Sequence, residues 1–434
     1  MGRDAAYTLA GLCGAACHGE ALAIDRCVLG DTIDRGFDFL LDRQAPDGRL
    51  DLHGVYSANE AGFPLPALAV AYRHLEHRDA VLFGRIADRM QAFMVRAADA
   101  VVAGDAYSAN HRWAAAAGPL AAVHRLFPAD RYIEKVHDYL ADPIDCEADG
   151  FWFEERSPNY NMVANHGLLV LADELDRPDL VELVVQSCKL VLRFLQPNGE
   201  ADSSFSFRQD RGQPDCPAAA YRVARRAAIA SGDGQLTSLA DQVRDARNNA
   251  TLMPMTLEWL EHPGDMPEPE TIETRFDAYW PDRQIARRRE GVTALTLAAD
   301  PGEHFFDTVL DSWGGVKRSE DWFHLHHGGI VLQSVRLELS RLGSVRPVAL
   351  ERLSSTRYRL ADHADGWGHI AHFRPGSPAV RMPHRYGGQI EVNIDPACID
   401  LAMDFESPDV IQSSLRFFVR AGVEVEGIGR LQAG

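Results

Sequence analysis

An aromatic and polar motif that recurs about every fifty residues limits the folds open to this chain more than any other feature. It stands at Val55 (VYSANEAGFPLPALAVAY), at Ala106 (AYSANHRWAAAAGPLAAV) and at Ser157 (SPNYNMVANHGLLVLA), and each copy opens an alanine- or leucine-rich stretch with helical spacing. A looser fourth copy runs from Phe205 to Ala230. About fifty residues is the length of two antiparallel helices with their loops, so the sequence predicts a series of helical hairpins.

Turns between the predicted helices also repeat. A helix pattern ending in LLDRQAPDGRLD (40–51) recurs as LRFLQPNGEAD (192–202), and each passes through Pro and then Asp-Gly or Asn-Gly. One hairpin cannot bury its apolar face alone, so neighbouring hairpins must stack, either as a superhelical array or as a toroid. The loops carrying Tyr56, Tyr107 and Tyr160 would then lie at one end, around a shared depression. The toroid is favoured because the loops of a superhelical array need not repeat an aromatic and polar rim.

The pattern changes after residue 260. The stretch EHPGDMPEPETIETR (261–275) is rich in proline and acidic residues and is interpreted as a linker. Short alternating runs follow and predict strands, namely VTALTLAA, GGIVLQSVRLEL, YRLADH, WGHIAHFRP, QIEVNID and LRFFVRAGVEVEGIG. We therefore expect an α+β multidomain protein, with an α/α toroid over residues 1–262 and an antiparallel β-sandwich-like domain over residues 263–434.

Charge and length exclude several classes of function. The chain has 434 residues and a net charge of −19, so nucleic acid and anionic membranes, which require a basic surface, are not expected as partners. Its apolar runs are too short to cross a membrane. No signal peptide is evident, so we expect a cytoplasmic protein, or a periplasmic or secreted one after signal removal. The 7 cysteines fit neither a disulfide framework nor zinc ligands, and the oligomeric state stays open.

Residues 149–167 (DGFWFEERSPNYNMVANHG) combine helix-start chemistry with an unusual cluster of titratable and aromatic side chains. Ser157 and Pro158 form an N-cap and first-position pair, so a helix is expected to begin there, with Tyr160 in its first turn. Arg156 stands on the approach to that turn. A tyrosine packed under a loop, with its hydroxyl hydrogen bonded, is the alternative interpretation of Tyr160.

Histidines gather in WFHLHHGG (322–329). Alternation along a strand places His324 and His326 on one face and His327 on the other. A metal site would need a third ligand from elsewhere, for which the candidates are Asp321, His363 and His369. No spacing fixes their distance, so a strand that lines a domain interface is favoured. No cofactor or metal is expected, and a structural divalent metal in the β-domain is unsupported.

Two motifs resemble the heparinase II/III-like polysaccharide lyases. ERSPNY (155–160), preceded by Asp149-Gly150, is similar to the acidic-x-Ser-Pro-x-Tyr segment that bears the family's catalytic tyrosine. Asn110-His111, ahead of an Ala-Gly-Pro helix that ends in LFP, is similar to the family's Asn-His pair one hairpin upstream. The resemblance implies an incomplete α/α toroid followed by an antiparallel β-domain. The family's His-Gly-His-x-x-Asp stretch is not matched after residue 326, so its metal site and third catalytic histidine are not implied.

Cleavage of a uronate polymer by β-elimination requires removal of the weakly acidic proton at C5 and protonation of the departing O4. Tyr160 can do both, because a cation beside it, Arg156 or another arginine, favours the phenolate. Asn110 and His111 can stabilise the charge that builds on the carboxylate. We therefore expect a polysaccharide lyase acting on an acidic, uronic-acid-containing polysaccharide or oligosaccharide, with those four residues as its catalytic groups. The expected substrate-binding residues are Tyr56, Asn59, Tyr107, Trp113, Asn159, His166, Arg208, His324 and His326.

Other interpretations remain open. Asn110 and His111 also fit an ordinary capped helix start with an exposed imidazole. Toroids of this kind also carry glycoside hydrolases that use two carboxylates, and the candidate carboxylates are Glu147, Asp149, Glu154, Glu155, Asp51, Asp105 and Asp202. A uronate C5-epimerase or a non-catalytic carbohydrate-binding protein would use the same scaffold. Elimination differs from these because it creates a double bond, conjugated to the carboxylate, that absorbs ultraviolet light.

Overall fold

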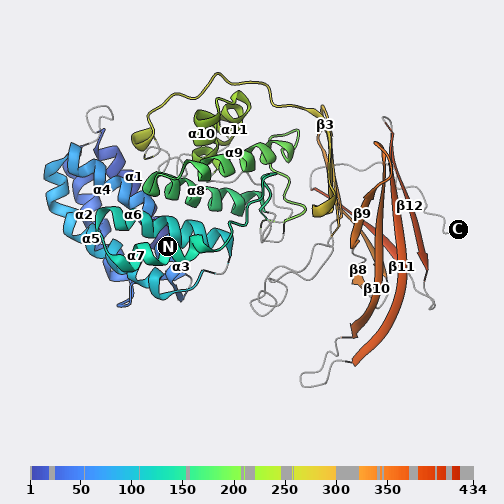
Figure 1. The fold of residues 1–434 in the computed structure, drawn as a ribbon, viewed down its shortest axis with the longest axis horizontal. Coiled ribbons are helices and arrows are strands. Elements are labelled where there is room, and N and C mark those ends of the chain that lie inside the picture. The colour runs from blue at the N-terminus through green and yellow to red at the C-terminus, as the bar shows by residue number, and fades with distance from the viewer. Residues whose placement is uncertain are drawn as a thin grey trace. The chain divides into compact units, whose positions relative to one another are not determined.

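The computed structural model describes residues 2–18, 25–52, 54–106, 108–152, 157–206, 210, 220–245, 257, 259–299, 322–339, 343–344, 347–370, 380–395, 398–406 and 413–420. The chain forms two compact units (Figure 1), of which the first, Met1–Arg193 with Cys216–Ile272, is mainly helical. The second, Phe194–Asp215 with Glu273–Gly434, is built on antiparallel strands. The predicted α+β fold class is confirmed. The predicted domain boundary after residue 262 stays a prediction. It differs from the compact units at two places, because residues 194–215 belong to the β unit and residues 263–272 to the helical unit.

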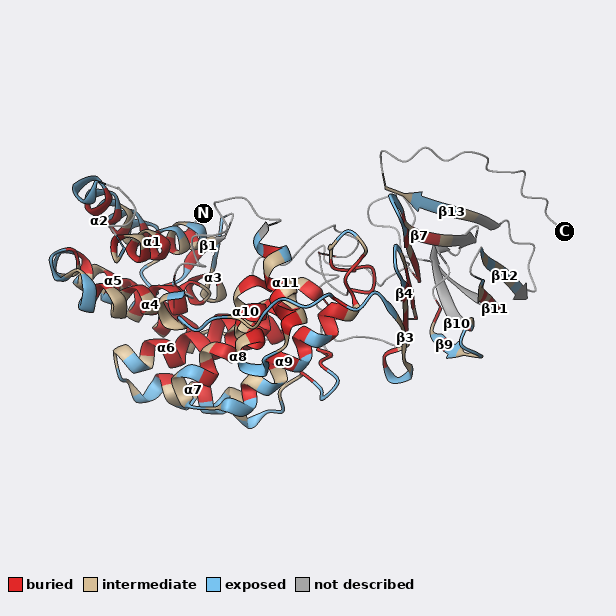
Figure 2. Cartoon of the chain, turned by 90° about the horizontal axis from the view of Figure 1, so that it is seen from above, coloured by how far each residue is buried: buried red, intermediate tan, exposed pale blue. Residues whose placement is uncertain are grey.

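The helical unit is an incomplete α/α toroid. It contains α1 (Gly2–Ala16), α2 (Arg26–Arg43), β1 (Leu50–Leu52), β2 (Val55–Ser57), α3 (Ala58–Gly62), α4 (Leu65–Arg78), α5 (Ala80–Ala103), the π-helix η1 (His111–Ala117), α6 (Gly118–Leu126), α7 (Asp130–Ala141), α8 (Pro158–Leu175), α9 (Pro178–Arg193), α10 (Ala220–Ser231) and α11 (Gly234–Asp245). Helices α1, α4, α6, α8 and α10 pack in succession as an inner layer, and α2, α5, α7, α9 and α11 each pair with one of them. The inner helices are mostly buried, whereas α2, α5 and α7 each keep an exposed face (Figure 2).

Turns with one shared backbone pattern follow α2, α7 and α9. They are closed by the bridges Gln44–Leu50, Cys146–Trp152 and Leu195–Ala201. Glycine holds the same place in each, at Gly48, Gly150 and Gly199, with φ of 87°, 87° and 84°. Only glycine enters this region readily, and a Cβ at Gly48 would also lie 1.9 Å from the Arg96 carbonyl oxygen on α5. The Asp-Gly and Asn-Gly repeat in the sequence is thus a structural repeat.

Two inner helices approach each other to backbone contact. A Cβ at Gly167 on α8 would lie 2.3 Å from the carbonyl carbon of Trp113 in η1, and a Cβ at Gly118 would lie 2.9 Å from the Gly167 carbonyl oxygen. Both contacts involve backbone atoms, which cannot swing aside as a flexible side chain can. The small residues at this crossing therefore fix the spacing between α8 and the η1–α6 helix.

The segment interpreted as a linker is bound to the helical unit as far as Glu270. Arg225 donates a hydrogen bond to the Gly264 carbonyl oxygen at 2.5 Å, and Ser238 donates one to the Glu270 carbonyl oxygen at 2.6 Å. The backbone N–H of Glu270 donates in turn to the Gly234 carbonyl oxygen at 3.0 Å. A composition typical of linkers here belongs to a segment held along α10 and α11.

The second unit is a sandwich of two antiparallel sheets. Its strands are β3 (Arg275–Trp280), β4 (Ile285–Glu290), β5 (Thr293–Ala298), β6 (Phe323–His327), β7 (Ile330–Leu339), β8 (Gly343–Ser344), β9 (Ala349–Arg352), β10 (Arg357–Ile370), β11 (Val380–Ile394), β12 (Ile399–Glu406) and β13 (Ser413–Val419), with a 3₁₀ turn, η2 (Pro281–Arg283). One sheet has the order β13-β7-β6-β5-β4-β3 and the other β12-β11-β10-β9. Leu295, Leu297 and Val335 of the first pack against Leu360 and Ile390 of the second.

Most of the predicted strands are present. The runs beginning at residues 292, 328, 358 and 389 correspond to β5, β7, β10 and β11. The ends of WGHIAHFRP and LRFFVRAGVEVEGIG lie outside the described residues. The sequence analysis did not identify β3, β4, β8, β9 or β12. In β4, three consecutive arginines in IARRRE hide the alternation.

Gly167→Ala tests the helix crossing. We expect a loss of stability of about 1–3 kcal/mol, because the added methyl group meets backbone atoms and not a movable side chain. Gly84→Ala is the matched control, since Gly84 lies on an exposed face of α5 and a methyl group added there would meet no atom within 4 Å. That change should instead stabilise the helix by roughly 0.5–1 kcal/mol. Urea unfolding of both variants decides the matter, and equal effects would contradict the proposed role of Gly167.

Candidate functional site

Tyr160 lies in the first turn of α8, as predicted. Ser157 is the N-cap of this helix and its hydroxyl oxygen accepts a hydrogen bond from the Tyr160 backbone N–H at 3.0 Å, with Pro158 in the first helical position. Tyr160 and the neighbouring Asn159 are both half-buried. The backbone of Tyr160 is therefore held by the helix cap, and its side chain is only partly withdrawn from solvent.

Asn110 and His111 stand where the chain enters η1. Asn110 exposes 2% of its surface, and its Oδ1 accepts a hydrogen bond from the Ser108 hydroxyl at 2.6 Å. His111 is half-buried, and its ring meets the edge of the Phe63 ring at a centroid distance of 5.9 Å. The helix that follows has π-helical hydrogen bonding, a rare conformation that is frequent at functional sites. η1 packs directly against α8, which carries Tyr160.

Helices α1 and α3 support this region from the side. Tyr7 donates a hydrogen bond to the Phe63 carbonyl oxygen at 2.8 Å, and the Arg3 guanidinium lies 5.6 Å from the centre of the Phe63 ring. Arg3 also pairs with Glu60 at 3.0 Å. These contacts hold Phe63 in place, and His111 packs against its ring.

The predicted substrate-binding residues of the toroid have different environments. Tyr56 on β2 is 50% exposed and Asn59 on α3 is half-buried. Trp113 is fully buried in η1, so in this conformation its ring is a core residue with no surface for a ligand. His166 is half-buried and lines a cavity that does not include Tyr160 or His111.

Three predicted residues lie outside the described part of the chain: Tyr107, Arg156 and Arg208. Their roles stay predictions. A common cleft for Tyr56, Tyr107, Tyr160, Asn110 and His111 likewise stays a prediction.

His324 and His326 belong to the β unit and lie on one face of β6, as their alternation predicted. They expose 8% and 2% of their surface, whereas His327 is exposed. This face is covered by the segment that follows α9, and Asp202 of that segment accepts a hydrogen bond from His324 Nδ1 at 2.7 Å. Among the described residues, His324 Nε2 and His326 Nδ1 are buried without a hydrogen-bond partner. Asp202 thus holds the His324 ring in place through Nδ1.

A buried arginine completes this polar cluster. Arg287 on β4 is fully buried and pairs with Asp202 at 3.0 Å. It also donates to the Thr296 hydroxyl at 2.7 Å and to the Leu195 carbonyl oxygen at 3.0 Å, while Thr296 donates to Asp202. Neither Arg287 nor Thr296 was identified from the sequence, because their partner Asp202 lies 85 and 94 residues away from them.

The charges of this cluster follow from its contacts. Burial alone would raise the pKa of Asp202, but His324, Arg287 and Thr296 outweigh burial and hold that pKa far below its usual range. Burial lowers the pKa of Arg287 to about 10, which leaves it protonated at neutral pH. Burial also lowers the pKa of His326, and the nearby His324 adds to this effect. The cluster therefore contains an ionised carboxylate and guanidinium out of contact with water.

Within the described ranges, no group of three or more His, Cys, Asp or Glu side chains is arranged to hold a metal ion. In the same part of the chain, no helix is both long and apolar enough to cross a membrane.

Comparison with known proteins gives a structural relationship and no sequence relationship. No model of a known protein family matches the chain, and no curated protein matches it. The fold is similar to the crystal structure of heparinase III, with a TM-score of 0.53 and 11% sequence identity. The similarity covers 84% of this chain and 60% of heparinase III, so the chain spans less than two thirds of that protein. At this identity the likeness establishes the fold alone.

Asp202→Asn tests the buried cluster. Because the pKa of Asp202 is lower in the folded than in the unfolded chain, its charge stabilises the fold above about pH 4, and this contribution declines as the pH falls further. The variant leaves Arg287 buried without its counterion, so we expect a loss of about 3–5 kcal/mol at neutral pH and a weaker dependence of stability on acid. Hydrogen exchange in β4 and β5 of the full-length chain, recorded at several pH values, measures the loss of stability and its dependence on pH.

Two controls accompany this measurement. Asp282→Asn makes the same change at an exposed position of the same unit and should have little effect. Combining Asp202→Asn with Arg287→Gln should cost less than the sum of the single changes, because the two residues interact directly. Additive costs would show that the ion pair contributes nothing specific.

Proposed function

We propose that this protein is a polysaccharide lyase that cleaves a uronic-acid-containing polysaccharide or oligosaccharide by β-elimination. The observation that carries the proposal is the position of Tyr160, in the capped first turn of an inner toroid helix that packs against the helix opened by Asn110 and His111. The fold shared with heparinase III supports it, because that protein's name denotes a polysaccharide-cleaving enzyme.

In the proposed reaction the Tyr160 oxygen takes the proton from C5 of the uronate ring. The C4–O4 bond breaks, a C4–C5 double bond forms, and the phenol returns a proton to the departing O4. One tyrosine can serve both steps, since it gains the proton that it later donates. The half-buried position of Tyr160 suits this role because the side chain is only partly withdrawn from solvent.

Asn110 and His111 would stabilise the negative charge that develops on the uronate carboxylate. The Ser108 hydroxyl occupies the Asn110 Oδ1, so the amide N–H₂ of Asn110 is the end left to donate toward a ligand. Asn110 is almost entirely buried, and a donor withdrawn from water stabilises a developing charge more strongly than a solvated one.

One candidate carboxylate for the alternative function, a glycoside hydrolase, is Asp202, and its environment does not suit a general acid. A general acid needs a raised pKa at neutral pH, whereas Asp202 is fully buried and held ionised by Arg287 and His324. Asp202 therefore suits a structural ion pair better than proton donation to a glycosidic oxygen.

Tyr160→Phe tests the proposal. The change removes one oxygen and keeps the ring, so stability should fall by no more than about 1 kcal/mol. Turnover should fall by about 10²–10⁴-fold or more, because the variant cannot relay the proton. Asn110→Ala and His111→Ala should each reduce the rate less. Tyr139→Phe, which removes the same oxygen from outer helix α7, should leave the rate unchanged.

The assay is a screen of uronate polymers for the ultraviolet absorbance of the new double bond. Wild-type protein should produce it with at least one acidic polymer. Chain cleavage without absorbance would indicate hydrolysis and would contradict the proposal, as would near-normal elimination by Tyr160→Phe.

A further inference from the structure

A pocket with an accessible volume of about 60 Å³, partly open to solvent, lies among the helices of the helical unit. Its walls come from α4, α6, α8 and α10 and from the segment that ends at His262. Apolar side chains such as Val70 and Leu169 contribute to the lining together with charged ones. Tyr160, Asn110 and His111 are not among the lining residues, so the cavity is distinct from the proposed catalytic groups.

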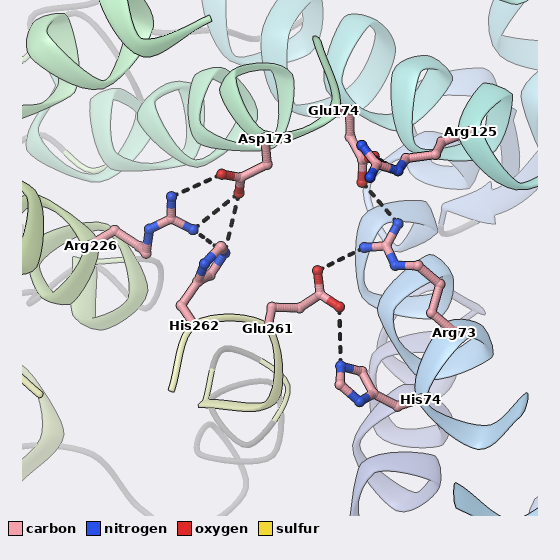
Figure 3. A network of polar contacts seen from close by, with 8 residues as sticks. All are labelled: Arg73, His74, Arg125, Asp173, Glu174, Arg226, Glu261 and His262. Atoms are coloured by element: carbon pink, nitrogen blue, oxygen red, sulfur yellow. Dashed lines mark hydrogen bonds and ion pairs between the residues drawn. The ribbon is translucent and has the colours of Figure 1, made fainter. Parts of the chain in front are cut away.

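Glu261 and His262 bring two polar side chains to this pocket (Figure 3). Glu261 accepts a hydrogen bond from Arg73 on α4 at 2.8 Å. His262 lies 3.2 Å from Asp173 on α8, and Asp173 also pairs with Arg226 on α10 at 2.9 Å. Two of the lining carboxylates therefore have cationic partners.

The third lining carboxylate is also compensated. Glu174 pairs with Arg73 at 2.9 Å and with Arg125 at 3.4 Å. Arg73 thus forms ion pairs with both Glu174 and Glu261, and Arg226 forms one with Asp173. The negative charges of the wall are balanced by the groups already named.

Two lining groups are left over, Arg222 and His166. Within the described residues, neither makes a hydrogen bond or an ion pair, and both are half-buried. Arg222 on α10 and His166 on α8 come from helices that pack against each other, and both line the same pocket. A cation without a carboxylate partner in a confined space is costly unless an anion or water satisfies it.

The imidazole of His166 is a neutral hydrogen-bonding group. Burial lowers the pKa of His166 well below its ordinary value, and the positive charges of Arg222 and Arg226 add to the effect, while Asp173 opposes it. At neutral pH the ring therefore has one N–H donor and carries no charge. Beside it, Arg222 supplies up to five N–H donors in a planar fork.

The size and polarity of the cavity match a carboxylate. At about 10–15 Å³ for each water-sized sphere, about 60 Å³ holds roughly four such spheres, enough for a carboxylate with a short aliphatic stem. The planar fork of arginine pairs with a carboxylate in two parallel hydrogen bonds. The three compensated carboxylates in the wall disfavour a more highly charged anion.

We propose that Arg222 and His166 form a carboxylate-binding site inside the helical unit. The ligand is a small organic acid or the carboxylate of a sugar acid, with its charge on Arg222 and its aliphatic part against Val70 and Leu169. The site contains none of the proposed catalytic residues, so carboxylate binding can be tested independently of the proposed lyase activity.

Thermal unfolding of the full-length chain measures the binding, since a ligand that binds only the folded state raises the unfolding temperature with its concentration. The probes are acetate and glucuronate, with acetamide and glucose as uncharged counterparts at equal ionic strength. Wild-type protein should be stabilised by at least one acid and not by its uncharged counterpart. Stabilisation by acetate identifies a site for small carboxylic acids in general, and stabilisation by glucuronate alone identifies one for sugar acids.

Variants separate binding from a structural role. Arg222→Gln should bind the acid roughly tenfold more weakly or worse, because one charge-assisted contact is lost. Without ligand it should be as stable as wild type, since no protein partner loses its cation. Arg222→Lys should bind with intermediate affinity, because it keeps the charge and loses the fork. Arg177→Gln, which removes the same charge from an exposed position, should bind like wild type.

Histidine NMR gives a second readout in the folded protein. A bound carboxylate should raise the pKa of His166, because a nearby negative charge stabilises the imidazolium. Equal stabilisation by the acids and their uncharged counterparts would overturn the proposal. So would wild-type affinity in Arg222→Gln, or a His166 titration that saturating acid leaves unmoved.

Discussion

The backbone contact between α8 and η1 at Gly167 is the constraint on which the proposed active site depends. Two helices that touch through backbone atoms have no side chain between them that can yield, so their separation is fixed. Tyr160 begins one of these helices, and Asn110 and His111 begin the other. Groups that must act on one sugar ring require this kind of rigid support, because a displacement of about 1 Å costs a large factor in rate.

Ion pairs hold the far ends of the inner helices in a comparable way. Asp173 and Glu174 lie in the last turn of α8, where the helix dipole disfavours negative charge. Arg73, Arg125 and Arg226 from three neighbouring helices offset this cost. The helices are thereby joined across the inner layer by charges, and the segment carrying Glu261 and His262 adds two more links.

Local chemistry explains what the sequence predicted well. The start of α8 at Ser157 and Pro158, the Gly48 and Gly199 turns and the alternation of His324 and His326 each depend on a few neighbouring residues, so short-range rules suffice. The π-helical form of η1 and the pairing of Asp202 with Arg287 depend on contacts between distant segments. Arginine in IARRRE gave no indication of burial, because an arginine is buried only where a partner meets it. The anchors of the Pro-rich stretch after residue 260 lie on α10 and α11, so its composition alone did not reveal them.

The cluster around Asp202 also determines which residues make up the β unit. Arg287 is fully buried in the sheet, yet its acceptors Asp202, Gln196 and the Leu195 carbonyl come from the segment between α9 and α10. Without that segment the guanidinium would lose its counterion Asp202 and two further acceptors, and breaking a buried ion pair costs several kcal/mol, on the order of 3–5. The polar face of the sheet and the segment after α9 are therefore one structural unit, although the helical repeat continues beyond them in the sequence.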